Sequence, residues 1–523
     1  MNSPHPHIRS LPPEGAQCPP WDGPAAGMDA VIELLRILRE IAPSARHMSA
    51  DSRRIGPGDV FLAFPGAVHD GRAHIASAIH AGAAAVLWEP EGYNWDAEWR
   101  VPHLPVAGLK ARAAALAAAW CGQPSHALWM IGITGTNGKT SVAQWLAATL
   151  TDLGRKTATI GTLGNGYPGQ LAQASHTTPD AVDLQRLLAE YRSEGAAGVA
   201  MEVSSHGLDQ GRVEGVAFDV AVFTNLSRDH LDYHGSMENY AAAKSRLFHW
   251  SGLKAAVLNA DDELGAALIA QLRGGAAHVL SYGLQSGDVH AVRCDADRMG
   301  LRLEIATPWG RGELVSPLLG EFNAYNLLAT LAALLASAVP LEAALAALAK
   351  LQPVAGRMQR VETAAADGDA PTVIIDFAHT PDALDKVLAA LKPLTRGRLI
   401  CVFGCGGGRD TGKRPLMGAA VAARADQAIV TSDNPRNEDP AHIVAGILAG
   451  MPPQQTVILD RRAAINAAIA AADAQDIVVL AGKGHEDYQE IHGVKHPFSD
   501  LVEARQALAA RSAKPARNTH ASA

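Results

Sequence analysis

The amino-acid sequence predicts an α/β protein of about three units built on parallel sheets. Its 523 residues are too many for one hydrophobic core and correspond to about three domains of roughly 100–200 residues each. From residue 128 onward, short apolar segments alternate with amphipathic helical segments, an order typical of parallel sheets with helices on both faces. A change in composition at residues 351–359 separates the last two units.

Composition and charge exclude several classes of protein. Hydrophobic residues make up 48% of the chain and charged residues 19%, which is ordinary for a globular enzyme. The net charge of −8 argues against a general nucleic-acid binder, which would carry a basic excess. The few scattered cysteines indicate a reducing compartment, and no apolar run reaches the ~18 residues of a membrane span. Because the N-terminus lacks an apolar signal core, we expect a cytosolic protein.

The first unit is expected to be small. Residues 1–28 are rich in Pro, Gly and His and are expected to be disordered. A helix that begins near Val31 follows, and strands are predicted at residues 59–64 and 82–88. The alanine-rich helix at residues 109–120 could belong to this unit or to the next. We therefore expect an extension at 1–28, units at 29–107, 108–352 and 353–511, and a loose tail at 512–523.

The second unit begins with a glycine-rich loop between a strand and a helix. An apolar strand at residues 128–133 leads into Gly135, Thr136, Asn137, Gly138, Lys139, Thr140 and Ser141. Such a loop turns backbone N–H groups toward an anion, and the helix N-terminus adds its positive dipole end. Lys139 would reach the outer phosphates and Thr140 would hold magnesium. Ile133 stands where the strict pattern has glycine, but the sequence still favours a nucleotide site over a plain turn.

Polar residues follow two later strands of the second unit, at residues 199–203 and 218–223. These are Glu202, His206, Asp229, His230 and Asp232, which we expect on adjacent strand ends. In open α/β sheets, ligands gather at the carboxyl ends of strands, so these positions favour chemistry. A carboxylate and an imidazole there could serve a magnesium ion that keeps several waters. Each of these residues taken alone could instead be an ordinary hydrogen-bonded loop residue.

Other positions in the second unit have simple structural explanations. Thr178 is a suitable N-cap and Pro179 a suitable first helical residue. By its local sequence, Lys244 is expected to be an exposed helix lysine. Asn323 and Asn326 lie three apart and are expected on one helix face.

The third unit offers four strands that each end in a polar loop, at residues 372–376, 399–403, 427–431 and 476–480. Thr380 is expected to cap the helix after the first strand, and residues 404–414 are expected to form a flexible basic loop. Asp439 and Pro440 are explained by helix capping, but capping gives no role to Arg436. A guanidinium at that position would suit bidentate binding of a carboxylate.

Taken together, these motifs resemble those of the Mur ligases, cytosolic ATP-dependent amide-forming enzymes of peptidoglycan precursor synthesis. Residues 135–141 are similar to the family's nucleotide loop, which also occurs in folylpolyglutamate synthases. Further matching motifs stand in family order at residues 177–179, 202–206, 225–234, 242–245, 323–326 and 356–359. Residues 433–436 and 482–486 resemble the branch that adds meso-diaminopimelate as the third residue of the peptide. The resemblance covers about residues 29–510.

The resemblance implies a UDP-binding first domain, a central P-loop-type ATPase domain and a Rossmann-like third domain that receives the amino acid. It implies that the γ-phosphoryl group of ATP passes to the glutamyl carboxylate of UDP-N-acetylmuramoyl-L-alanyl-D-glutamate. The amine of diaminopimelate then attacks the acyl phosphate, releasing phosphate and leaving an amide. In phosphoryl transfer a protein mainly positions groups and neutralises charge, which suits the loop and Lys139.

The resemblance also implies roles for individual residues. For ATP it implies Gly135, Thr136, Asn137, Gly138, Lys139, Thr140, Ser141, Asn323, Arg357 and Asp376. For the UDP-linked substrate it implies Ser52, Thr177, Thr178, Ser204, Gln210 and Arg212, while His176 replaces an asparagine common in the family. For diaminopimelate it implies Arg409, Asp433, Asn434, Pro435, Arg436, Gly482 and Glu486.

For magnesium the resemblance implies Thr140, Glu202, His230 and Lys244, the last as a carbamate that turns a cation into a carboxylate. Lys139, Glu202, His230 and Lys244 are then the expected catalytic groups. Small molecules are the only partners expected, without nucleic acid or a membrane span, and the protein is expected to be a monomer.

Arg436 provides a charge argument for diaminopimelate over lysine, because lysine lacks the distal carboxylate. A buried arginine left unpaired costs several kcal/mol, of the order of the ~3–5 kcal/mol for breaking a buried pair. Two rival enzymes are the ligase that adds D-alanyl-D-alanine and a folylpolyglutamate synthase, and residues 433–436 argue against both. A nucleotide-binding regulatory or scaffold protein without catalysis is a third alternative, disfavoured by the intact Lys139, Glu202, His230 and Lys244.

Overall fold

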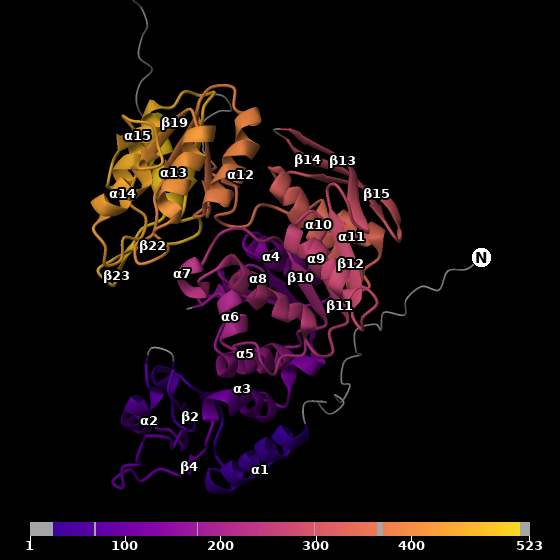
Figure 1. The fold of residues 1–523 in the computed structure, drawn as a ribbon, viewed down its shortest axis with the longest axis vertical. Helices are drawn as coiled ribbons and strands as arrows, with labels where there is room; N and C mark the ends of the chain where they lie inside the picture. Colours follow the sequence, from indigo (N-terminus) through magenta and orange to yellow (C-terminus); the bar gives the residue numbers. More distant parts are fainter. Residues whose placement is uncertain (1–24, 67–68, 175, 298, 363–369, 513–523) are drawn as a thin grey trace, which may run out of the picture.

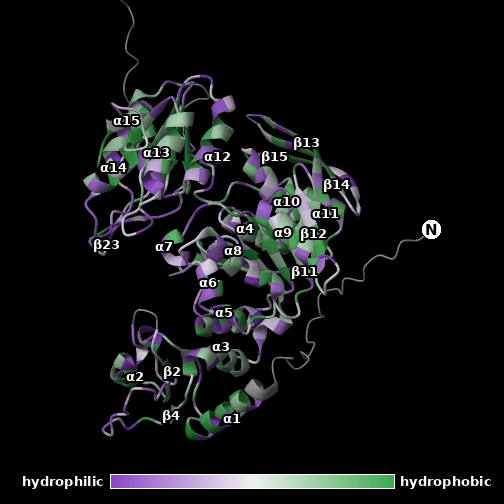
Figure 2. Cartoon of the chain, in the orientation of Figure 1, coloured by the Kyte–Doolittle hydropathy of each residue, from purple (hydrophilic) through white to green (hydrophobic). Residues whose placement is uncertain are grey.

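The computed structural model describes residues 25–66, 69–174, 176–297, 299–362 and 370–512. They form three α/β units in chain order, with the second unit between the first and the third (Figure 1). The expected N-terminal extension and C-terminal tail lie largely outside the described residues. In Figure 2, hydrophobic residues gather on the helices and strands that pack within each unit. No helix among the described residues is long and apolar enough to cross a membrane.

The first unit is a four-stranded parallel sheet in the order β1-β2-β3-β4. Its strands are β1 (Met48–Ser49), β2 (Val60–Ala63), β3 (Ala85–Trp88) and β4 (His103–Pro105). Helix α2 (Ile75–His80) packs on one face, and α1 (Ala25–Ile41) and α3 (Leu109–Trp120) pack on the other. Leu109 and Leu116 of α3 are fully buried in this core. Val182 of the second unit belongs to the same cluster, so the alanine-rich helix contacts both of its neighbouring units.

The second unit is built on an eleven-stranded sheet in the order β15-β14-β13-β12-β11-β10-β5-β9-β6-β7-β8. Its strands are β5 (Trp129–Thr134), β6 (Thr157–Gly161), β7 (Gly164–Tyr167), β8 (Gln170–Ala172), β9 (Gly198–Glu202), β10 (Val220–Phe223), β11 (Ala255–Asn259), β12 (His278–Gly283), β13 (Val289–Asp297), β14 (Gly300–Thr307) and β15 (Gly310–Ser316). The strands from β13 to β6 are parallel, and antiparallel strands extend both ends.

Helices cover both faces of this sheet. Helices α4 (Lys139–Asp152), α10 (Glu321–Ala336) and α11 (Leu341–Leu348) bury one face, and α5 (Ala181–Ser193) and α9 (Glu263–Leu272) bury the other. Short helices α6 (Ser205–Asp209), α7 (Leu231–His234) and α8 (Met237–Ser245) lie beside the carboxyl ends of the strands. Strand β5 pairs with both β9 and β10, so the expectation that the ends of β9 and β10 are adjacent is wrong. The glycine-rich loop that follows β5 lies between them.

The third unit is a six-stranded sheet in the order β16-β17-β21-β18-β19-β20. Its strands are β16 (Gln359–Arg360), β17 (Thr372–Asp376), β18 (Leu399–Phe403), β19 (Gln427–Val430), β20 (Thr456–Val457) and β21 (Ile477–Ala481). Helices α12 (Pro381–Leu391), α13 (Lys413–Arg424) and α14 (Pro440–Leu448) cover one face, and α15 (Arg461–Ala471) and α16 (Asp500–Ser512) cover the other. A hairpin of β22 (Tyr488–Ile491) and β23 (Val494–Pro497) completes the unit.

The four expected strands of the third unit are parallel neighbours, which brings their polar loops to one edge. The expected caps are confirmed, since Thr380 accepts a hydrogen bond from the Ala383 N–H and Asp439 caps α14. The expected flexible basic loop is shorter than predicted. Lys413 and Arg414 are buried residues in the first turn of α13.

Candidate active site

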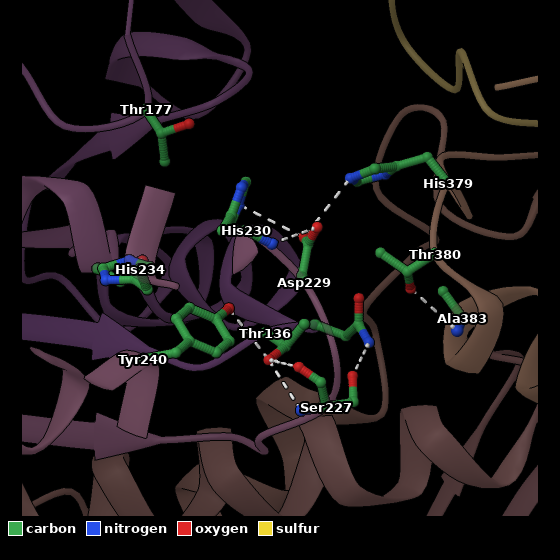
Figure 3. Close-up of polar contacts among 12 residues, drawn as sticks. Thr136, Thr177, Ser227, Asp229, His230, His234, Tyr240, His379, Thr380 and Ala383 are labelled. Carbon is green, nitrogen blue, oxygen red and sulfur yellow. Dashed lines mark hydrogen bonds and ion pairs between the residues drawn. The ribbon is translucent and has the colours of Figure 1, made fainter. Parts of the chain in front are cut away.

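The glycine-rich loop has a conformation that requires its glycines. Gly135 and Gly138 have φ values of +145° and +88°. A Cβ on Gly135 would lie 1.9 Å from Thr224 Oγ1, and one on Gly138 would lie 2.3 Å from Asn326 Oδ1. Thr136 Oγ1 accepts from the Ser227 N–H at 3.0 Å and lies 3.2 Å from the Tyr240 hydroxyl (Figure 3). The segment after β10, Tyr240 of α8 and Asn326 of α10 therefore pack closely around the loop and leave no room for larger residues at the two glycines.

Lys139 lies over its own loop. Its Nζ donates to the carbonyl oxygens of Gly135 at 2.8 Å and Thr136 at 2.9 Å. Burial lowers the pKa of Lys139, and Glu202 and Asp229 partly oppose this effect. Since an ammonium has three N–H donors, these two hydrogen bonds leave one donor for a phosphate.

A buried carboxylate lies beside the start of α4. Glu202, at the end of β9, is 1% exposed, and its Oε2 accepts from the Thr140 hydroxyl at 3.0 Å. Thr162 donates to the same carboxylate through its N–H at 2.8 Å and its hydroxyl at 3.1 Å. A hydroxyl next to a carboxylate at a phosphate loop fits magnesium, which binds proteins through one or two carboxylates plus substrate phosphates and waters. Thr162 follows β6, and sequence reasoning missed it.

Asp229 joins the second and third units through two imidazoles. Its Oδ2 lies 3.4 Å from His230 Nε2 and 4.0 Å from His379 Nε2 of the third unit (Figure 3). Burial alone would raise the pKa of Asp229, and the positive charge of Lys413 opposes that effect. Burial lowers the pKa of His230, which favours the neutral imidazole that can act as a metal ligand. His379 was not among the residues that the sequence predicted for the site.

Lys244 is buried, so the expectation of an exposed lysine is wrong. It is 1% exposed, and its Nζ donates to the Gly135 carbonyl oxygen at 2.7 Å. The same nitrogen lies 4.4 Å from the centroid of the Tyr240 ring. Burial, and then the charge of Lys139, lower the pKa of Lys244 well below its usual value. This environment favours an uncharged amine directly beneath the glycine-rich loop.

The residues of the second unit that are expected near the UDP-linked substrate form a second cluster. Thr178 Oγ1 donates to the Glu202 carbonyl oxygen at 2.9 Å and contacts Ser204 Oγ at 3.0 Å. Arg212 Nη1 donates to the Thr178 carbonyl oxygen at 2.9 Å, and Thr177 Oγ1 lies 3.0 Å from Thr162 Oγ1. Thr178 is not the expected helix cap. Asp180 caps α5 instead, by accepting from the Val182 and Asp183 N–H groups.

Of two further residues expected near ATP, Arg357 connects the second and third units and Asp376 bonds within the third. Arg357, between α11 and β16, donates from Nη2 to Thr140 Oγ1 at 3.2 Å. Asp376 is buried at the end of β17 and accepts from the N–H groups of Met358 at 2.7 Å and Ala378 at 2.8 Å. On the other side, Asn323 accepts a hydrogen bond from Asn326 at 3.2 Å, which confirms that the two share a helix face.

The loop after β19 carries the residues expected to bind diaminopimelate. Arg436 has a φ of +54°, and its Nη1 donates to the Gly407 carbonyl oxygen at 2.6 Å. Its Nε lies 3.3 Å from Glu490 Oε2, and its side chain is 27% exposed. Arg436 is therefore neither deeply buried nor unpaired, and the large penalty expected for an unpaired buried arginine is reduced. Nothing in the sequence indicates that Arg436 would pair with Glu490.

One cavity of about 1100 Å³ connects these clusters across the second and third units. All of the residues predicted for the site line it except Ser52, Gly135, Gln210, Lys244 and Pro435. Ser52 lies in the first unit, in the short helix at Ser52–Arg54. Gln210 accepts a hydrogen bond from Arg212 Nε at 3.0 Å. A glycine-rich loop, a buried carboxylate and an arginine-bearing loop that line one cavity suit transfer from a nucleotide to a second substrate.

Three family models match successive segments of the chain. They describe the Mur ligase family, catalytic domain at residues 45–120, the Mur ligase middle domain at 133–334, and the Mur ligase, glutamate ligase domain at 356–484. The chain is 53% identical over 483 residues to a protein of Chromobacterium violaceum, covering 92% of this chain and 97% of that one. The chain belongs to the Mur ligase family.

That Mur ligase of Chromobacterium violaceum is named UDP-N-acetylmuramoyl-L-alanyl-D-glutamate--2,6-diaminopimelate ligase. A protein of the same name from Pseudomonas aeruginosa is 51% identical over 470 residues, covering 89% of this chain and 95% of that one. A solved structure with this name is 38% identical with a TM-score of 0.62, covering 91% of this chain and 99% of that one. MurF from Acinetobacter baumannii shares the fold, with a TM-score of 0.66 at 19% identity and coverage of 92% and 98%.

Proposed function

We propose that this Mur ligase adds meso-diaminopimelate to UDP-N-acetylmuramoyl-L-alanyl-D-glutamate with hydrolysis of ATP to ADP and phosphate. Relatives about half identical over most of the chain have names that specify this reaction with 2,6-diaminopimelate. The observation that carries the proposal is the single cavity between the glycine-rich loop and the loop of Asp433 and Arg436. Such a cavity can hold a nucleotide, an acceptor carboxylate and an amine together.

The proposed reaction has two steps. The glutamyl carboxylate of the UDP-linked substrate attacks the γ-phosphorus of ATP, releasing ADP and forming an acyl phosphate. An amine of diaminopimelate then attacks the acyl carbon, and phosphate leaves with the electrons of the broken C–O bond. Lys139 and the loop N–H groups would neutralise the transferring phosphoryl group, which is the main task of a protein in this chemistry. The cavity would hold the reactants close and exclude water.

Magnesium is the proposed metal, and it would neutralise phosphate charge when bound. The contact between Thr140 and Glu202 fits it, because a hydroxyl in the first turn of α4 and a carboxylate at the end of β9 lie 3.0 Å apart. His230 and a carbamate on Lys244 are proposed for a second ion. Among the residues that the structure describes, no group of three or more His, Cys, Asp or Glu side chains forms a ready metal cluster. The substrates' phosphates are therefore proposed to supply part of the coordination.

Arg436 is proposed to bind the distal carboxylate of diaminopimelate. Asn434 and Glu486 lie beside it along the same wall of the cavity, and the Asn434 amide donates to Glu486 at 2.8 Å. A guanidinium, an amide and a carboxylate match the carboxylate and ammonium of one amino-acid centre. Lysine lacks the carboxylate, so Arg436 would keep only its contacts with Gly407 and Glu490.

The first test is phosphate release with ATP, magnesium and the UDP-linked dipeptide, run in parallel with meso-diaminopimelate and L-lysine. We expect strong release with diaminopimelate and little with lysine. Equal release with both amino acids would support a ligase but contradict the proposal that Arg436 selects diaminopimelate. No release with either amino acid would overturn the proposed function. Action as a cytoplasmic monomer in peptidoglycan synthesis, which supports cell shape and division, is part of the same proposal.

A further inference from the structure

Lys483 is a buried cation behind the wall that carries Asn434 and Glu486. It is 0% exposed and does not line the cavity, whereas Asn434 and Glu486 do. Its Nζ donates to Glu486 Oε2 at 2.9 Å and to Asn434 Oδ1 at 3.1 Å. Both hydrogen-bond partners of this ammonium are therefore residues of the cavity wall.

A tight turn after β21 directs Lys483 inward. The glycines on either side have positive φ values, +113° for Gly482 and +54° for Gly484. A Cβ on Gly482 would lie 2.5 Å from Asp433 Oδ2, and one on Gly484 would lie 2.7 Å from Phe377 Cβ. Glu486 closes the turn with its N–H donating to the Lys483 carbonyl oxygen at 2.9 Å. The backbone thus places the lysine and the carboxylate on the same side of one turn.

The ammonium determines how the two wall residues present their polar atoms. Lysine has donors only, so it fixes the Asn434 oxygen toward itself, where the Glu490 N–H also donates at 3.0 Å. The Asn434 nitrogen must then face Glu486, to which it donates at 2.8 Å. Both donors meet Glu486 Oε2, and no hydrogen bond among the described residues uses Oε1. One carboxylate oxygen is therefore held and the other is left for a ligand.

Burial of an ammonium has a cost that packing alone does not explain. Apolar residues of similar volume are often as stabilising as a buried ion pair. The Lys483 ammonium instead faces the Glu486 carboxylate, which lines the cavity. An exposed lysine of the same hairpin region, Lys495, lies 4.0 Å from the centroid of the Tyr488 ring and contacts neither wall residue.

We propose that Lys483 is a positioning residue for the amino-acid substrate, one that sets the orientation of Asn434 and Glu486 without touching the ligand. The proposal rests on the proposed function of the cavity. It assigns recognition of the substrate ammonium to Glu486 Oε1, with Lys483 as the fixed countercharge behind it. The ammonium of the substrate and that of Lys483 then share one carboxylate from opposite sides.

The test is a comparison of Lys483→Met with Lys495→Met by steady-state phosphate release. For Lys483→Met we expect KM for meso-diaminopimelate to rise roughly 10- to 100-fold, as for an unpaired charged group, while KM for ATP and for the UDP-linked dipeptide stays within about twofold. Lys495→Met should match the unaltered protein. An unchanged KM for diaminopimelate, or a fall in kcat with all KM values unchanged, would overturn the proposal.

A double-mutant cycle with Glu486→Gln separates positioning from general stability. If Lys483 acts through Glu486, the double variant should lose no more than about threefold beyond Glu486→Gln alone. If the losses caused by the two single substitutions multiply in the double variant, Lys483 does not act through Glu486. Lys483→Met leaves the Glu486 carboxylate without its ammonium partner, which could prevent folding. The double variant has no such carboxylate, so it can be measured in place of Lys483→Met. Diaminopimelate-dependent turnover by the unaltered protein is measured first, and its absence would count against the proposed function and not against Lys483.

Discussion

Arg357 and Thr140 are joined by a hydrogen bond of 3.2 Å although they lie in different units. The Thr140 hydroxyl uses its own proton to bind Glu202 at 3.0 Å, so its oxygen is free to accept from the guanidinium. Arg357 also lies 4.3 Å from the centroid of the Phe377 ring, at the end of β17. The start of α4 is thereby connected to the third unit through one side chain.

Replacement of Arg357 should weaken the nucleotide site. We expect Arg357→Met to raise KM for ATP roughly 10- to 100-fold, because hydrogen bonds to charged groups contribute about 1.5–3 kcal/mol. Steady-state kinetics with varied ATP measure this effect. Arg360→Met is the matched control, because Arg360 is exposed three residues further along the chain. Equal KM values for both variants would remove Arg357 from the site.

The glycine-rich loop should not tolerate a methyl group at Gly138. In Gly138→Ala, the new Cβ would lie 2.3 Å from Asn326 Oδ1, so we expect loss of most ATP binding by calorimetry. Gly154→Ala controls for backbone strain, since Gly154 has a φ of +82° but no atom within 4 Å of its Cβ position. It should cost only about 1–2 kcal/mol of stability and leave ATP affinity unchanged. Normal ATP affinity of Gly138→Ala would show that the loop can relax.

We expect turnover to depend on carbon dioxide, through a carbamate on Lys244. Its lowered pKa leaves more of the uncharged amine, the form that reacts with CO₂, than an ordinary lysine has at the same pH. We expect protein stripped of CO₂ to regain turnover on addition of bicarbonate, faster as pH rises toward the lowered pKa. Lys244→Met should be inactive and unresponsive, whereas Lys350→Met, at an exposed lysine, should respond normally. Normal turnover by Lys244→Met would exclude the carbamate.

The charge of Lys244 also predicts a pH dependence of stability. The folded protein disfavours the ammonium, so without the carbamate its free energy of unfolding should rise with pH. The rise begins near the lowered pKa of the folded state and ends near the usual lysine value of about 10.4. Chemical denaturation of the unaltered protein and of Lys244→Met, both free of CO₂, would measure the difference. Parallel pH profiles would contradict a lowered pKa of Lys244 in the folded protein.

Arg436→Ala should affect one substrate selectively. We expect loss of most diaminopimelate turnover with ATP affinity nearly unchanged, because the guanidinium contacts only Gly407 and Glu490 among the described residues. The exposed Arg273 provides the control variant Arg273→Ala. If Arg436→Ala weakens ATP binding as much as it weakens turnover, the residue does not select the amino acid.

The strand–loop–helix order, and hence the fold, could be predicted from apolar periodicity and glycine. The environment of single side chains could not. Lys244 sits in a helix whose local sequence is typical of a solvent-exposed face, yet tertiary packing against Tyr240 and Gly135 buries it. A threonine followed by proline satisfies the rules for a cap, but Asp180 two residues later competes more effectively. Rules based on neighbouring residues cannot predict burial by tertiary packing, or which of two nearby residues caps a helix.

Contacts between loops that are distant in the sequence could not be predicted either. Glu490 reaches Arg436 because the β22–β23 hairpin lies along the loop after β19, where Arg436 and Ile491 form an isolated bridge. Likewise, the position of β5 between β9 and β10 is a property of the sheet order. The family motifs named most of the residues that line the cavity. Two of their partners, Thr162 in the lining and Lys483 behind it, became evident only from the structure.

The carbonyl oxygen of Gly135 accepts from two lysines, Lys139 at 2.8 Å and Lys244 at 2.7 Å. An ammonium at Lys244 would repel that of Lys139, and the charge of Lys139 accordingly lowers the pKa of Lys244. A carbamate at Lys244 would reverse the sign of that interaction and make the ammonium of Lys139 easier to keep. Linkage is reciprocal. A nucleotide that favours charged Lys139 would therefore favour modification of Lys244 by the same factor, and carbon dioxide would act as an effector of ATP affinity.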